Sequence, residues 1–174
     1  MLIEVPKKID LQTHPIFKKM TEECGFEQID ADSFEAFLKK DGLSLILFVD
    51  DPNRMKETMD AIVIAPELAK SCQLIKNKAV ICPPHARKLS AIYGFKRWPA
   101  MVFVRDGAYL GAVDGLRLWS QLVAEVDEII QRTPSFPPSI GIPIKSCSTN
   151  SLLGQSIFLL KASAQVHSPM KKRQ

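Results

Sequence analysis

The pattern of apolar positions along the chain predicts an α/β protein with a buried central strand. Residues 43–49 form the longest nearly unbroken apolar run, which a single serine interrupts. Such a run is typical of a strand that is buried on both faces, as in the middle of an α/β sheet. Shorter apolar runs predict further strands at residues 26–29, 79–82, 100–104 and 108–113.

Apolar residues at helical spacing fill the intervals between these strands. The predicted helices cover residues 11–24, 33–40, 55–73, 85–93 and 116–131. Asp32 or Ser33 is expected to cap the second of them. Pro66 is expected to kink or break the third, because proline lacks the N–H that a helix interior requires.

The order of these elements predicts a mixed central sheet flanked by helices, a three-layer sandwich. Two successive β-α-β crossovers give parallel strands, and Asp106 and Gly107 form a strong signal for a hairpin turn between the last two strands. Beyond residue 133, several prolines exclude regular structure. We therefore expect a helical extension at 1–25, the α/β domain at 26–133, and a proline-rich linker with a basic, flexible tail at 134–174.

Charge is unevenly divided between the domain and the tail. All 19 acidic residues and 18 of the 23 basic residues lie in residues 1–133, so that this segment is near −1 although the chain carries +4. Five dispersed basic residues in the tail are a weak signal for nucleic acid or anionic lipid. We expect neither nucleic-acid binding nor stable membrane insertion. The third-ranked alternative is a general interaction domain whose basic tail contacts membrane or RNA.

The cysteines indicate reduced thiols rather than a disulfide framework. Cys24, Cys72, Cys82 and Cys147 form no C-x-x-C pair, and no histidine stands at zinc-finger spacing from them. The first residues lack the basic-then-apolar pattern of a signal peptide, and residues 43–49 are too few to span a bilayer. The sequence therefore predicts a cytoplasmic protein with no metal site and no cofactor.

The second half of the domain resembles thioredoxin. The resemblance rests on residues 93–100 (Tyr-Gly-Phe-Lys-Arg-Trp-Pro-Ala), the predicted hairpin and the glycines Gly111 and Gly115. It spans residues 26–131, about 60% of the chain. It implies a thioredoxin-like fold in which the bond between Trp98 and Pro99 is cis.

The thioredoxin redox motif is missing from this chain. That chemistry needs an exposed thiolate at a helix N-terminus and a second thiol to resolve the mixed disulfide. The corresponding residues 50–54, after the central strand, read Asp-Asp-Pro-Asn-Arg. Asp51 suits either helix capping or ligand contact. The alternative to a binding protein is a thiol-disulfide oxidoreductase that uses one cysteine, Cys72 or Cys82.

A narrower resemblance is to the hydrogenase accessory proteins called HyaE, HoxO and HupG, which are thioredoxin-like and lack the cysteine pair. The features shared with them are Asp51, Pro52, residues 93–100, Gly111, Asp114, Gly115 and Trp119. The resemblance implies a chaperone without enzymatic activity. Its partner would be the precursor of the small subunit of an uptake nickel–iron hydrogenase, bound with its twin-arginine signal peptide before export.

The resemblance also implies where the signal peptide would bind. In this fold, the loop after the central strand and the cis-proline loop border one groove. We hypothesise that Asp50 or Asp51 meets an arginine of the peptide, because arginine prefers bidentate contact with a carboxylate. Arg97 is a further candidate contact beside the proline.

The apolar part of such a peptide needs an apolar surface on the same groove. A peptide can pair with the backbone beside Pro99 as an added strand does. Trp98 is the candidate aromatic anchor, and Met55 or Met59 offers an adaptable apolar contact. Each of these three side chains suits core filling as well.

Overall fold

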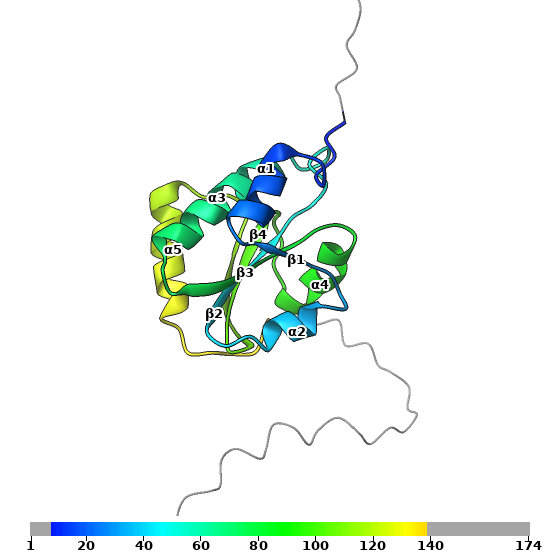
Figure 1. Cartoon of the computed structure of the whole chain (residues 1–174). Helices are drawn as coiled ribbons and strands as arrows, with labels where there is room; N and C mark the ends of the chain where they lie inside the picture. Colours follow the sequence, from blue (N-terminus) through cyan, green and yellow to red (C-terminus); the bar gives the residue numbers. More distant parts are fainter. Residues whose placement is uncertain (1–7, 139–174) are drawn as a thin grey trace, which may run out of the picture. The chain divides into compact units, whose positions relative to one another are not determined.

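The computed structural model describes residues 8–138, which form a five-stranded sheet with helices on both faces (Figure 1). This confirms the thioredoxin-like α/β sandwich that the sequence predicts. The strands lie side by side in the order β1-β3-β2-β4-β5. Their bounds are β1 Glu27–Ile29, β2 Leu43–Phe48, β3 Ile75–Ile81, β4 Ala100–Arg105 and β5 Ala108–Asp114. The predictions for the tail from residue 139 onward, and for Cys147, lie outside the described residues.

Strand β2 occupies the centre of the sheet and sets the position of the loops around it. It pairs parallel with β3 and antiparallel with β4, so that Phe48 near its end stands opposite Ile81 and Ala100. All six residues of β2 are buried, which explains its unbroken apolar pattern. The turn between β4 and β5 consists of Asp106 and Gly107, whose φ angles of 50° and 80° fit a type I′ hairpin.

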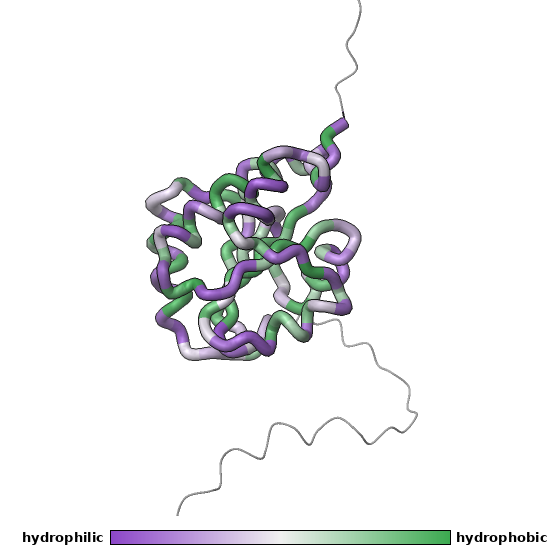
Figure 2. Tube along the Cα trace, in the orientation of Figure 1, coloured by the Kyte–Doolittle hydropathy of each residue, from purple (hydrophilic) through white to green (hydrophobic). Residues whose placement is uncertain are grey.

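One face of the sheet is covered by three helical segments and holds the larger part of the core. These segments are α1 Pro15–Lys18, which continues directly into the π-helical turn η1 Lys19–Glu23, α3 Glu57–Ser71 and α5 Trp119–Ile130. Leu45 and Leu47 of β2 pack here with Phe17, Ile62 and Val126 in one cluster of buried side chains. In Figure 2 the central strands are largely hydrophobic, whereas β1, the first part of β3 and the outer turns of the helices carry hydrophilic positions.

The opposite face is covered by α2 Phe34–Leu38 and α4 His85–Tyr93 and is rich in aromatic side chains. Phe48 of β2 meets Tyr93 and Phe95 edge to face, with ring centroids 5.8 and 5.2 Å apart. Phe34 makes a similar contact with Tyr93 at 6.2 Å. Aromatic pairs favour this geometry, so the rings fix where the chain turns from α4 toward β4.

The local helix signals differ from the structure in two respects. Ser33 stands at the N-cap of α2 without a side-chain cap, so the expected capping by Asp32 or Ser33 is wrong. Asp30 instead closes the turn that precedes α2, because its Oδ1 accepts from the backbone N–H groups of Asp32 and Ser33 at 3.0 and 2.9 Å. Pro66 does not break α3, which runs on to Ser71 because its apolar side stays buried against the sheet.

The described chain continues past α5 along the edge of the sheet. Ser135 forms a β-bridge with Tyr109, whose carbonyl oxygen accepts from the Ser135 N–H at 2.8 Å. The backbone then passes Gly94, where a Cβ would lie 2.2 Å from the carbonyl oxygen of Pro138. None of the helices in residues 8–138 combines the length and apolar character needed to cross a bilayer.

Candidate functional site

Three loops meet where β2 and β3 end and β4 begins. Because β2 and β3 are parallel and β4 is antiparallel to them, Phe48, Ile81 and Ala100 lie at the same end of the sheet. The loops are therefore residues 49–56, which replace the redox motif, residues 82–84, and residues 94–99. The cis bonds Pro83–Pro84 and Trp98–Pro99 lie in the second and third of them.

Asp50 is a buried carboxylate with a partner inside the protein. Its side chain is only 10% exposed, and Arg87 of α4 binds it through both oxygens, at 2.9 Å to Oδ1 and 2.7 Å to Oδ2. The N–H of Asp51 donates to the same Oδ1 at 2.8 Å. Asp50 raises the pKa of Arg87 through this hydrogen-bonded contact and its charge. Asp50 thus joins the loop after β2 to the start of α4.

Asp51 is partly exposed and organises a tight turn rather than capping α3. Its Oδ1 accepts from the backbone N–H of Asn53 at 2.9 Å and from the Asn53 side-chain amide at 2.7 Å. Helix α3 begins only at Glu57, without a side-chain cap. The hydrogen bonds from Asn53 hold the pKa of Asp51 below its ordinary value, and the charge of Lys8 contributes to the same shift.

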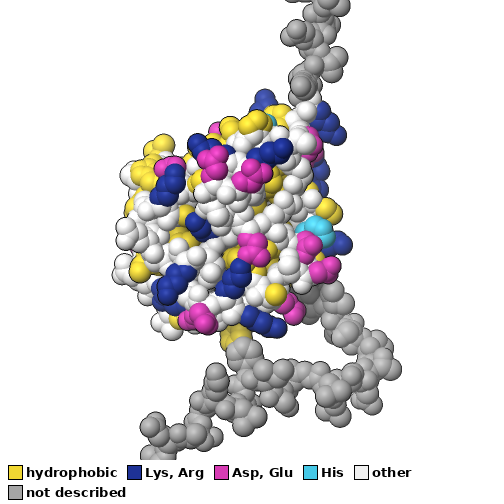
Figure 3. Space-filling model, in the orientation of Figure 1, with side chains coloured by type: hydrophobic (Ala, Val, Ile, Leu, Met, Phe, Trp, Pro, Cys, Tyr) yellow, Lys and Arg dark blue, Asp and Glu magenta, His cyan; other side chains and the backbone are white. Residues whose placement is uncertain are grey.

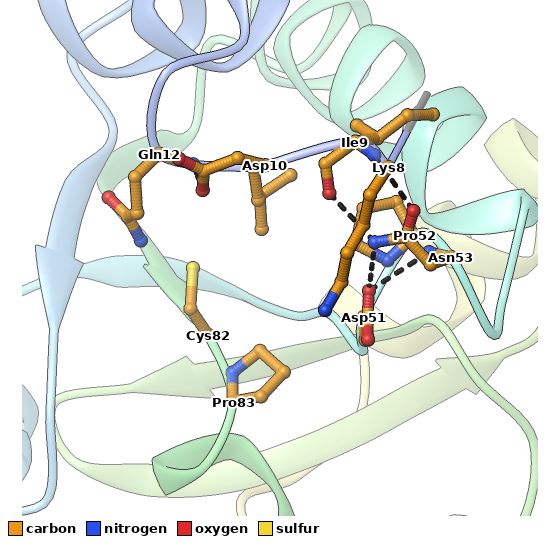
Figure 4. A pocket seen from close by; sticks show the side chains of 10 residues that line it. Lys8, Ile9, Asp10, Gln12, Asp51, Pro52, Asn53, Cys82 and Pro83 are labelled. Carbon is orange, nitrogen blue, oxygen red and sulfur yellow. Dashed lines mark hydrogen bonds between the residues drawn. The ribbon is translucent and has the colours of Figure 1, made fainter. Parts of the chain in front are cut away.

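The N-terminal segment lies across this turn. Asn53 donates through Nδ2 to the carbonyl oxygen of Ile9 at 2.7 Å and accepts at Oδ1 from the Ile9 N–H at 2.8 Å. We call residues 8–12 the N-terminal strap. Between the strap, the turn and residues Cys82 and Pro83 lies a cavity of about 480 Å³ (Figure 4). This contact is not predictable from the sequence, because no local pattern connects residue 9 with residue 53.

The cis-proline loop is held from the other side by β5. The N–H of Gly115 donates to the carbonyl oxygen of Pro99 at 2.7 Å. Asp114 accepts from the backbone N–H groups of Lys96 and Arg97 at 3.2 and 3.3 Å, and the Arg97 guanidinium pairs with it at 3.1 Å. Burial alone would raise the pKa of Asp114, but these contacts outweigh burial and lower it.

The predicted apolar contacts lie at different depths. Trp98 is half-buried, with its ring edge to face against Phe95 at 5.2 Å between centroids. Met55 is half-buried in the loop before α3, whereas Met59 packs against the main core. Two exposed side chains that the sequence analysis did not consider as contacts, Leu118 and Trp119 at the start of α5, are 71% and 47% exposed.

The structure brings the predicted site residues to one end of the sheet but divides them between two cavities. Asp51 borders the cavity under the N-terminal strap. Pro99 borders a small cavity of about 10 Å³ together with Ile64 and Leu116. Arg97 and Trp98 directly precede Pro99 in the cis-proline loop and line neither cavity.

Of the two cysteines considered for thiol chemistry, Cys82 is a poor candidate for a reactive thiolate. Burial raises the pKa of Cys82 to about 12, far from the range of a reactive thiolate. Cys72 follows the C-terminal end of α3 and is half-buried. Within residues 8–138, no three side chains of His, Cys, Asp or Glu gather where they could hold a metal ion.

A family model described as hydrogenase-1 expression protein HyaE matches residues 16–122, more than half of the chain. The chain belongs to the HyaE family. Its relatives include the hydrogenase expression/formation protein HoxO of Azotobacter vinelandii, which is 31% identical over 78% of this chain and 94% of its own length. HoxO of Cupriavidus necator is 31% identical over 77% of this chain and 84% of its own. HupG of Rhodobacter capsulatus is 28% identical over 68% of this chain and 87% of its own.

Solved structures place this HyaE-family chain in the thioredoxin fold. A complex of ferredoxin:thioredoxin reductase and thioredoxin f2 contains a chain with a TM-score of 0.50 and 16% identity, covering 60% of this chain and 94% of that one. The J-Trx1 fragment of ERdj5 has the same TM-score and 18% identity, over 67% of this chain and 56% of that one. At these identities the likeness concerns the fold alone.

Proposed function

We propose that this protein is a cytoplasmic, non-enzymatic maturation factor for an uptake nickel–iron hydrogenase. It binds the precursor of the small subunit through its twin-arginine signal peptide before export. Membership of the HyaE family supports the link to hydrogenase maturation. The observation that carries the binding role is the loop after β2, which holds the carboxylate of Asp51 and the amide of Asn53 where redox relatives of the fold need thiols.

The geometry of the site suits a peptide that is extended and positively charged. A peptide strand would pair with the backbone of Trp98, beside Pro99, because Pro99 itself lacks an N–H and its carbonyl oxygen already accepts from the Gly115 N–H. Asp51 offers a solvent-facing carboxylate to an arginine, whereas Asp50 contributes by fixing the loop through Arg87.

The apolar stretch of the signal peptide would follow the other side of the cis-proline loop. Trp98 and Met55 are half-buried and present part of their surface. Arg97 is exposed but paired with Asp114, so its positive charge is held at a defined place at the edge of the site. Amphipathic and thioether side chains of this kind suit a surface that accepts variable apolar sequences.

The single-cysteine oxidoreductase is the weaker alternative. Such an enzyme needs an accessible thiolate near neutral pH, whereas Cys82 is buried and its pKa is raised to about 12. A thiol titration of the native protein separates the two functions. A cysteine that reacts as a thiolate near pH 7 would favour the oxidoreductase.

The proposed function is tested by calorimetric titration with a synthetic signal peptide that carries two adjacent arginines before an apolar stretch. We expect binding to the full chain and a loss of roughly tenfold in affinity for Trp98→Ala, as for an aromatic anchor. The control is Phe136→Ala, which removes a 94% exposed aromatic side chain that follows the bridge from Ser135 to Tyr109, at the other end of β5. Absence of any binding to the full chain would refute the proposed function.

A further inference from the structure

The cavity under the N-terminal strap has the size and lining of a side-chain receptor. Its volume is about 480 Å³, and its wall combines apolar groups from Leu11, Pro52 and Pro83 with charged groups from Lys8, Asp10 and Asp51. An apolar wall with a few polar groups at defined positions is the usual composition of a ligand pocket. Figure 4 shows the strap above and Cys82 and Pro83 below, with open space between them.

The strap is built to stay in place above this cavity. Leu11 is buried in the main core, and two hydrogen bonds join Ile9 to Asn53. Between these two anchors, Asp10 is oriented by its own turn: Oδ1 accepts from the Gln12 N–H at 3.1 Å and Oδ2 accepts from the Thr13 hydroxyl at 3.1 Å. A carboxylate has about four lone-pair sites in all. Asp10 therefore keeps acceptor capacity for a ligand.

The charges around the cavity favour a cation with an apolar stem. Asp10 comes from the strap and Asp51 from the opposite turn, so two carboxylates border the same space. The side chain of Lys8 extends across it toward Asp51, and its charge acts on that carboxyl group (Figure 4). Lys8 forms a single flexible point charge, whereas a guanidinium offers five donors in a planar fork. Lys8 thus shows that the space beside Asp51 accepts a cationic side chain, and an arginine would form more hydrogen bonds there than the lysine does.

We propose that this cavity receives one arginine side chain of a partner peptide. The guanidinium meets Asp10 and Asp51, the arginine stem lies against Leu11, Pro52 and Pro83, and Lys8 swings out into solvent. The inference rests on the proposed function only in taking the peptide to be arginine-bearing. It makes the strap, and Asp10 in particular, part of the binding site and a determinant of specificity.

The experiment uses the isotope-labelled full chain and acetyl-arginine amide, with NMR shifts of the Ile9, Asp10 and Asn53 amides as the readout. We expect saturable shifts at these amides, weaker shifts with acetyl-lysine amide, and none with the neutral acetyl-citrulline amide. Asp10→Asn is expected to weaken arginine binding roughly fivefold, and Lys8→Ala to strengthen it about threefold, the range of exposed charge pairs. Glu35→Gln, which changes an exposed carboxylate on α2, is the matched control.

Two outcomes would overturn the inference, and both are separate from failure of the proposed function. Absence of saturable shifts at the strap amides would remove the cavity as an arginine site. Equal binding of the arginine and citrulline compounds would show that Asp10 and Asp51 do not distinguish a charged from a neutral ligand. In either case the signal peptide still binds the full chain in calorimetry if the proposed function holds, whereas failure of that function leaves the full chain without peptide binding.

Discussion

The two sides of the site are both held by polar contacts near the surface but leave very different amounts of open space. On one side, the N-terminal strap and the turn after β2 are joined by exposed polar contacts and enclose about 480 Å³. On the other side, Asp114 and Gly115 hold the cis-proline loop against β5, and the adjoining cavity has room for about one water molecule. The difference suggests a division of roles in which the cis-proline side supplies a rigid backbone edge and the strap side supplies a place for a side chain.

The visible surface of the protein carries no large acidic patch whose electrostatic field would attract a basic peptide. In Figure 3, basic and acidic side chains alternate over the visible face without a continuous patch of one sign. Local carboxylates therefore have to provide the selectivity, because mixed surface charges are screened within about 10 Å at ordinary salt concentrations. The strap side is where such carboxylates border a cavity.

The largest effect is expected from the ion pair that supports the turn after β2. Arg87→Ala leaves Asp50 buried with no opposite charge, and burying an unpaired carboxylate is costly. We expect the midpoint of thermal unfolding to fall by roughly 5 °C. The fall is limited to this size because solvent screens the charge of the half-exposed arginine in the ion pair. Lys88→Ala, which changes the exposed neighbour on α4, serves as the control in calorimetry. An equal loss in both variants would contradict a specific role for the pair.

A smaller effect is expected on the cis-proline side. Asp114→Asn removes the charge that binds Arg97 and weakens the hold on the loop, at a cost of about 1 kcal/mol in the free energy of unfolding. Because folding lowers the pKa of Asp114, its contribution to stability is present above the pKa of the unfolded state, about 3.9, and is lost as pH falls through the folded value. Urea unfolding from pH 7 to pH 2.5 measures this loss, which should be smaller in the variant than in the unchanged protein, since Asp51 and Asp30 still contribute their own loss in both.

The smallest effect on stability, about 0.5 kcal/mol, is expected on the strap side. Asn53→Ala deletes both side-chain hydrogen bonds to Ile9 in an exposed setting. Hydrogen exchange of the Ile9 amide should accelerate, whereas that of Leu47 in β2 should not change. Asn53→Asp keeps the acceptor but loses the donor. In this variant the exchange rate of the Ile9 amide should lie between the rates in the unchanged protein and in Asn53→Ala. Unaltered exchange at Ile9 in Asn53→Ala would show that Asn53 does not hold the strap.

The sequence predicts the fold well because the fold depends on patterns that a short window contains. The apolar run of β2 reflects burial on both faces, and Asp106 with Gly107 dictates the hairpin by backbone conformation alone. The helix boundaries are less well predicted at the N-terminus, where the expected helix over residues 11–24 is reduced to α1 and a π-helical turn. Pro15 at the first helical position explains why α1 begins there.

The candidate site is only partly predictable because its decisive contacts join distant residues. Asp50 and Arg87 are 37 residues apart, and Ile9 and Asn53 are 44 apart. The sequence identifies Asp50 and Asp51 as adjacent acids, but only the fold assigns one of them to an internal pair and leaves the other in solvent. Asp10 escaped notice for the same reason, since an exposed aspartate before a helix carries no distinguishing pattern.

The close passage of the chain over Gly94 has a practical consequence for anyone who dissects this protein. Gly94 ends α4 in the left-handed conformation and leaves space for the backbone of Pro138, while Ser135 adds to the edge of β5. A protein cut after residue 133 would therefore lose two attachments of the folded unit. A truncation that removes only the tail should keep the chain through Pro138.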